Sequence, residues 1–117
     1  MKTHMDLDVW KKSMDFVENI YKISNQFPKE EVYGLTSQIR RAAISIPSNI
    51  AEGASRQGIK EFIQFLYISL GSLSEVETQT MLAKRLNFVN NIDIILTEII
   101  TIKKMLNGLI THLKNKI

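Results

Sequence analysis

The side chains that most often carry catalysis or bind metals are few in this chain, and they are scattered. The only two histidines, His4 and His112, lie at opposite ends of the 117-residue sequence. There is no cysteine, which excludes disulfides and thiolate metal sites. We therefore predict no metal site, no cofactor and no histidine-based catalytic pair.

Three glutamates, Glu52, Glu75 and Glu77, are the remaining candidates for acid–base chemistry. Glu77 is expected on the inner face of a helix, where a buried carboxylate needs a partner. Arg40 and Arg41 are expected one or two turns away on a neighbouring helix, so a structural ion pair that fixes the register is the preferred interpretation. The sequence also lacks the Glu-x-x-His pattern of di-iron bundles. We predict that the protein is not an enzyme.

The basic residues indicate a different chemistry, contact with nucleic acid. The net charge is +3 and the isoelectric point is about 9.2, and an oligomer would add the fields of its subunits. Arg56 and Lys60 flank the turn after Gly53, where backbone and side chains can meet a phosphate together. The alternative to an RNA contact, for each of these basic residues, is an ordinary solvent-exposed position on the protein surface. The candidate RNA contacts are Arg40, Arg41, Arg56, Lys60, Lys84 and Arg85.

Apolar residues recur every three or four positions over four segments, as in amphipathic helices. We predict helices at about 6–25, 33–53, 59–86 and 92–113. The short connections between them favour an all-α fold with a single domain, 1–117, built as an antiparallel up-down-up-down four-helix bundle. The most regular heptad pattern is in the last segment and consists of Ile92, Ile95, Ile99, Ile102, Leu106, Leu109 and Leu113.

Proline and glycine modify the two central helices. Pro47 predicts a kinked second helix that is not broken, because the apolar spacing continues in phase through it. Gly53 is expected to end that helix. Gly71 lies among small residues of the third helix, expected to face Ala42 and Ala43, and we predict that it lets the two backbones approach closely.

The first helix carries two apolar stripes, more than a monomeric bundle needs. One explanation is a broad core face, and the other is that one stripe faces another subunit. The first stripe consists of Leu7, Trp10, Met14, Val17 and Tyr21. The second stripe, which we assign to an oligomer interface, consists of Val9, Phe16, Ile20, Ile23 and Phe27.

The N-terminal sequence has no continuous apolar run of the kind that a secretory signal contains. No segment approaches the length of a membrane span either. We expect a soluble, cytoplasmic protein with no membrane partner.

The segment from Tyr33 to Gly53 reads YGLTSQIRRAAISIPSNIAEG and is too particular for a generic helix. It closely resembles the bacterial 23S ribosomal RNA intervening-sequence protein family, whose members are four-helix-bundle proteins. Shorter pieces match in order along nearly the whole chain: DVWK at 8–11, KEF at 60–62, FLY at 65–67, GSL at 71–73, EVETQ at 75–79 and AKRL at 83–86.

This resemblance implies a four-helix bundle that assembles into a homopentamer, which would give the second stripe of the first helix a partner. The family name reflects genes inside insertions in ribosomal RNA genes, and it denotes no biochemical activity. No catalytic residue comes with the family. Arg40, Arg41 and Arg56 match motif positions.

Two functions follow as expectations. The first is a non-enzymatic homopentamer that binds structured RNA through backbone electrostatics. The second is a protein-interaction scaffold or accessory subunit, for example of a retroelement reverse transcriptase. The second expectation comes from a similar group, the accessory variability proteins of diversity-generating retroelements, which are basic pentameric barrels that bind a reverse transcriptase and its RNA.

Overall fold

The computed structural model describes residues 3–117, and within this range the chain is helical with short connections. The four α-helices are α1 (Asp8–Ser24), α2 (Leu35–Ala54), α3 (Ile59–Arg85) and α4 (Asp93–Lys114), and two short 3₁₀ helices are η1 (His4–Asp6) and η2 (Lys29–Glu31). The predicted all-α four-helix fold is confirmed, with each helix end within two residues of its predicted position. None of the helices in residues 3–117 combines the length and apolar character that a membrane span requires.

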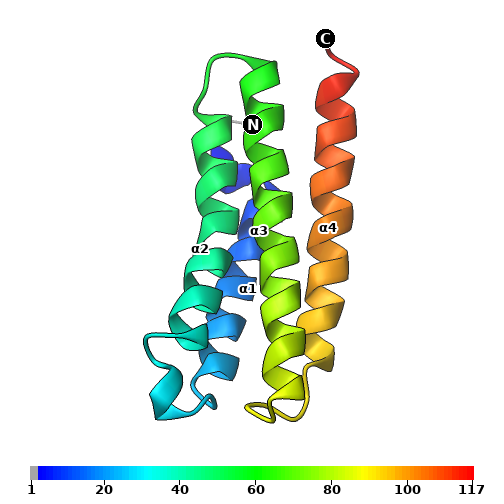
Figure 1. The fold of residues 1–117 in the computed structure, drawn as a ribbon. Helices are drawn as coiled ribbons and strands as arrows, with labels where there is room; N and C mark the ends of the chain where they lie inside the picture. Colours follow the sequence, from blue (N-terminus) through cyan, green and yellow to red (C-terminus); the bar gives the residue numbers. More distant parts are fainter. Residues whose placement is uncertain (1–2) are drawn as a thin grey trace.

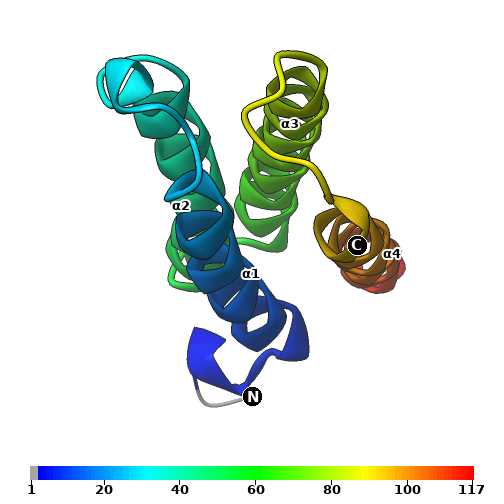
Figure 2. The ribbon, with the colours of Figure 1, turned by 90° about the horizontal axis from the view of Figure 1, so that it is seen from below.

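The helices form an elongated bundle with dimensions of 46 × 23 × 19 Å. Consecutive helices run in opposite directions and pack side by side, and α4 also packs against α1 (Figure 1). Seen along the bundle, α2 and α4 occupy opposite corners (Figure 2). The α2–α3 pair has the most extensive contact.

The core forms where the apolar stripes of all four helices meet. The heptad pattern of α4 faces inward as predicted, although Leu109 is only half-buried. The largest fully buried apolar side chains are Phe16 and Ile20 of α1, Ile39, Ile46 and Ile50 of α2, Leu66, Leu73 and Val76 of α3, and Ile99, Ile102 and Leu106 of α4.

The structure corrects the assignment of the two stripes of α1. The stripe predicted to face another subunit is buried within the chain's own core, so its side chains are not available to a second subunit: Val9, Phe16, Ile20, Ile23 and Phe27. Ser13 is fully buried in the same stripe and donates its hydroxyl to the carbonyl of Val9. This serine interrupts the apolar pattern in the sequence, although it keeps the heptad spacing. The other stripe, including Met14, is partly exposed.

The structure also exchanges the expected roles of two glycines. Gly53 does not end α2, which continues to Ala54. A Cβ atom at Gly53 would lie only 2.7 Å from the Cβ of Phe65, so the close approach of α2 and α3 occurs here. Gly71 is exposed, and an added Cβ would have no neighbour within 4 Å. Pro47 lies inside an unbroken α2, as predicted, and the kink stays a prediction.

Small residues hold the middle of α2 against α3, as the sequence predicts. The buried hydroxyl of Ser69 donates to the carbonyl of Ile46 at 3.0 Å. The hydroxyls of Ser45 and Ser72 form a hydrogen bond of 2.8 Å across the pair. Because serine is short, these bonds require closely spaced backbones, and they fix the register of α2 on α3.

Candidate nucleic-acid interface

The six predicted RNA contacts do not form one patch. Arg56 and Lys60 lie near the turn between α2 and α3, whereas Lys84 and Arg85 lie at the other end of α3 (Figure 1). At about 1.5 Å per residue, Lys60 and Lys84 are roughly 36 Å apart along the helix axis. Arg40 and Arg41, in the first half of α2, lie nearer the second group. The six residues therefore lie in different surroundings, at three places on the bundle.

Arg40 joins α2 to the C-terminal end of α1. Its Nε donates to the hydroxyl of Ser24 at 2.8 Å, and its Nη2 donates to Oδ1 of Asn25 at 2.9 Å and to the carbonyl of Tyr21 at 3.3 Å. The guanidinium also lies over the Tyr21 ring, 4.5 Å from the centroid. This half-buried side chain already uses most of its donors. These contacts give Arg40 a structural role, and its contact with RNA stays a prediction.

The ion pair expected between the second and third helices is not formed within residues 3–117. Glu77 instead pairs with Lys103 of α4, at 3.8 Å. Glu75 accepts a hydrogen bond from Nε2 of Gln79 at 3.3 Å. Adjacent helical residues point about 100° apart, so Arg41 does not share the contacts of its neighbour. Its exposed side chain forms no ion pair or hydrogen bond with the described residues.

Arg56 has its charge compensated locally. Its Nη2 lies 3.5 Å from Oε2 of Glu52, and its Nε lies 3.9 Å from Oε2 of Glu61. The guanidinium also lies 5.1 Å from the centroid of the Phe65 ring. These exposed pairs are weak individually, but together they reduce the positive charge at this turn. Lys60 is exposed and has no partner among the described residues.

Lys84 and Arg85 are exposed at the C-terminal end of α3. They border a hollow of about 470 Å³ between α3 and the start of α4. The other side chains around it are mostly apolar. The full lining is Met81, Lys84, Arg85, Asn87, Ile92 and Leu96. This end of the bundle combines positive charge with exposed apolar surface.

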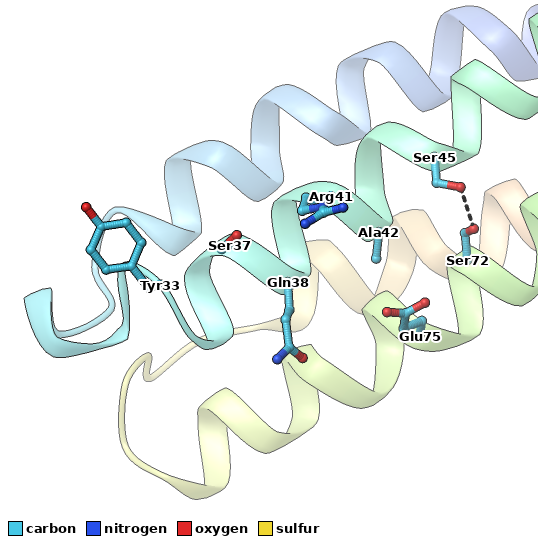
Figure 3. A pocket seen from close by; sticks show the side chains of 8 residues that line it. All are labelled: Tyr33, Ser37, Gln38, Arg41, Ala42, Ser45, Ser72 and Glu75. Carbon is cyan, nitrogen blue, oxygen red and sulfur yellow. Dashed lines mark hydrogen bonds between the residues drawn. The ribbon is translucent and has the colours of Figure 1, made fainter.

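A polar groove runs between α2 and α3 beside Arg41 (Figure 3). Its volume is about 590 Å³. Gln38 and Glu75 enter it from opposite helices, and the Ser45–Ser72 hydrogen bond lies at one end. Eight residues line the groove: Tyr33, Ser37, Gln38, Arg41, Ala42, Ser45, Ser72 and Glu75.

Positive charge that was not predicted from the sequence is concentrated on the second half of α4 and just after its end. No acidic residue follows Glu98 in the sequence, but four lysines do: Lys103, Lys104, Lys114 and Lys116. Lys114 donates to the hydroxyl of Tyr67 at 2.8 Å. Lys104 and Lys116 are exposed and have no partner among the described residues. The signals in the sequence were the adjacent pair Lys103 and Lys104 and the absence of acidic residues after Glu98.

The sequence analysis also missed a buried carboxylate between α1 and α4. Glu98 is only 7% exposed, and its two oxygens accept hydrogen bonds from Nδ2 of Asn19, both at 3.0 Å. Lys12 supplies the countercharge at 3.6 Å. These partners satisfy the carboxylate, which links the two helices. Within residues 3–117, no three metal-binding side chains gather closely enough to hold an ion.

An apolar groove separates α1 from α2 on the outside of the bundle. Its volume is about 350 Å³. Met14 and Ile44, one from each helix, are 43% and 41% exposed. The lining consists of His4, Trp10, Met14, Val17, Ile44, Pro47, Ser48 and Ala51. The partly exposed stripe of α1 therefore forms one wall of this groove.

A family model described as 23S rRNA-intervening sequence protein matches residues 5–108 of the 117-residue chain. The chain belongs to this family. The match spans the first three α-helices and most of α4, and it agrees with the resemblance drawn from the Tyr33–Gly53 motif. No curated protein shows a significant match.

Most of the family motif has a structural explanation in this fold. Three of its four isoleucines, Ile39, Ile46 and Ile50, fill the core. Arg40 bonds to the end of α1, Ser45 bonds to α3 and Gly53 packs against Phe65. Helix packing does not explain every position. The motif residues that instead face the polar groove are Tyr33, Ser37, Gln38 and Arg41.

Proposed function

We propose that this 23S rRNA-intervening sequence family protein is a non-enzymatic, cytoplasmic homopentamer that binds structured RNA through the phosphate backbone. The observation that carries the proposal is the acid-free, lysine-bearing C-terminal half of α4. Lysine is a compact point charge on a flexible stem, which suits contact with phosphates rather than readout of a base edge.

Assembly would strengthen this interaction. The chain carries a net charge of +3, so a pentamer would carry +15 on one particle. Such a field steers RNA to the surface and releases the counterions condensed on it. RNA affinity should therefore fall steeply as the salt concentration rises.

The apolar groove between α1 and α2 supports the assembly part of the proposal. Met14 and Ile44 expose apolar surface beside the half-buried ring of Trp10. A second copy of the chain would remove this surface from water, at about 25 cal/mol per Å². A stable interface of standard size buries roughly 800 Å² per partner, which would require neighbouring helix surface as well as the groove.

Light scattering of the purified protein tests both parts together. The mass would be measured with and without a structured RNA, at low and at high salt. A particle of five chains that gains RNA mass only at low salt supports the proposal. A pentamer that ignores RNA at both salt concentrations contradicts RNA binding, and a monomer contradicts the assembly.

The hollow beside Lys84 and Arg85 favours a second candidate, a protein scaffold or accessory subunit. Its apolar and basic lining suits a protein segment with apolar and acidic side chains, for example on a retroelement reverse transcriptase. Copurification of such a partner after complete nuclease digestion would support this function. Loss of the partner on digestion would show that RNA holds the two proteins together, which would favour RNA binding.

A further inference from the structure

We propose that the polar groove between α2 and α3 is a subsite for unpaired RNA, with guanine as the preferred base at Glu75. This inference rests on the proposed RNA binding and extends it from nonspecific backbone contact to recognition at one position. It concerns Arg41 and Glu75, which lie within the groove, and Tyr33, which lies at its outer end with its ring directed away from them (Figure 3).

The groove has suitable size and chemistry for such a ligand. Its volume of about 590 Å³ lies within the range of roughly 300–1,000 Å³ that is usual for small-molecule sites. Hydroxyl, amide, carboxylate and guanidinium groups line it. An apolar helix from a partner protein would leave these groups without water or hydrogen bonds, which disfavours that occupant.

The two charged groups of the groove remain separate. Arg41 and Glu75 lie on opposite helices, and they form no ion pair with each other. A free phosphate would be attracted to the guanidinium but repelled by the carboxylate. A nucleotide satisfies both groups, because its phosphate is anionic and its base edge presents N–H donors.

The carboxylate of Glu75 determines which base fits the groove best. Gln79 donates Nε2 to Oε2 of Glu75 at 3.3 Å, which leaves lone pairs of the carboxylate facing the groove. The Oε1 atom of Gln79 is buried and has no hydrogen-bond partner, which costs stability. Guanine is the base whose Watson–Crick edge has two adjacent N–H donors, and these match the two oxygens of a carboxylate.

Tyr33 provides a surface on which an adjacent base of the same RNA can stack, because its ring lies at the outer end of the groove, away from Glu75 (Figure 3). Its side chain is 95% exposed, although tyrosine normally buries its ring. The turn that carries it is fixed, because Oε1 of Glu31 accepts a hydrogen bond from the N–H of Leu35 at 3.1 Å, at the start of α2. An exposed aromatic ring at the end of a groove that also holds a cation suits the binding of unpaired bases.

The test measures fluorescence anisotropy of a short, unpaired RNA bound to the full chain. One RNA carries a central guanine, and matched RNAs carry adenine or inosine there. Because inosine lacks only the exocyclic amine, it should bind more weakly than guanine. Tyr33→Ala should weaken binding by about 5- to 150-fold, the equivalent of roughly 1–3 kcal/mol of stacking. Tyr33→Phe, the matched control, should bind like the wild type.

Two charge variants separate base recognition from phosphate contact. Glu75→Gln should abolish the preference for guanine over adenine without weakening the adenine RNA. Arg41→Gln should weaken all three RNAs equally and reduce the salt slope by about one. Glu18→Gln is the control matched in charge, because exposed Glu18 lies on α1, forms no ion pair with the described residues and does not line the groove.

The outcomes distinguish this inference from the proposed function. If the wild type binds structured and unpaired RNA but Tyr33→Ala and Glu75→Gln behave like it, the nucleotide subsite is wrong and backbone binding stands. If Tyr33→Ala changes the mass of the particle rather than RNA affinity, Tyr33 is a subunit contact and the inference is overturned. If the wild type binds no RNA, both proposals fail.

Discussion

Replacing Gly53 with alanine tests the close packing between α2 and α3. The new Cβ would lie 2.7 Å from the Cβ of Phe65, 3.0 Å from Cδ1 of Phe62 and 3.3 Å from the carbonyl oxygen of Phe62. The favourable separation between carbon atoms is about 3.5–4.0 Å. Because two of these atoms are a Cβ and a backbone oxygen, a change of rotamer cannot relieve the overlap, and the helices have to move apart.

Two opposing effects determine the magnitude. Overpacking of this kind costs about 1–3 kcal/mol. Alanine also favours a helix over glycine by about 1 kcal/mol, and Gly53 lies inside α2. We expect a net loss in the free energy of unfolding of about 1–2 kcal/mol, the upper part of the overpacking range less the propensity gain.

Gly71→Ala is the matched control, because it makes the same chemical change in the interior of the next helix. Gly71 is exposed, and its added Cβ would have no neighbour within 4 Å. Only the propensity effect remains, so this variant should gain about 0.5–1 kcal/mol. The same substitution should therefore have opposite signs at the two positions.

Urea unfolding followed by far-ultraviolet circular dichroism measures both free energies. All variants would be compared at one protein concentration, because assembly makes the midpoint depend on concentration. A Gly53→Ala variant as stable as the wild type would refute the packing argument. A destabilised Gly71→Ala variant would show that another chain covers that face of α3.

Five further substitutions, in three experiments, test the structural roles of polar and apolar side chains. Arg40→Lys should lose about 1–2 kcal/mol of stability, because lysine cannot reproduce the three hydrogen bonds. Arg41→Lys should change the stability by less than about 0.5 kcal/mol. Equal effects of the two variants in urea unfolding would contradict a structural role that only Arg40 has. Glu98→Ala should cost about 1.5–3 kcal/mol, because it removes hydrogen bonds to a buried carboxylate. Lys12→Ala should cost about 1–3 kcal/mol, because it leaves this buried carboxylate without its countercharge; a Lys12→Ala variant as stable as the wild type would show that the hydrogen bonds alone hold the carboxylate. Ile44→Glu should lower the particle mass in light scattering and leave the circular dichroism unchanged, and an unchanged mass would exclude the α1–α2 groove as a subunit contact.

The helices and their order could be predicted because the apolar spacing in all four segments is regular. The heptad of α4 identified its buried face almost completely. The buried face of α1 could not be chosen in the same way, since both of its stripes have helical spacing. Ser13 made the buried stripe look interrupted, although its hydroxyl bonds to Val9 within the helix. Hydropathy alone does not indicate that a serine can satisfy its own polar group in this way.

Side-chain partners were harder to predict than helices, because they depend on the rotation of each helix. Arg40 and Arg41 are adjacent in sequence, but one bonds to the end of α1 and the other faces the polar groove. Glu98 went unnoticed because a single carboxylate beside an apolar stripe resembles a surface residue. Gly53 and Gly71 could be distinguished only once the spacing of α2 and α3 was known.

The salt dependence of RNA affinity tests the proposed function most directly. The dissociation constant of a structured RNA would be measured between about 50 mM and 200 mM salt, for the wild type and for a Lys104→Gln, Lys116→Gln double variant. The proposal predicts a steep linear fall of log affinity with log salt concentration, and a shallower slope for the double variant. Wild-type affinity that is absent or independent of salt would contradict binding through the phosphate backbone.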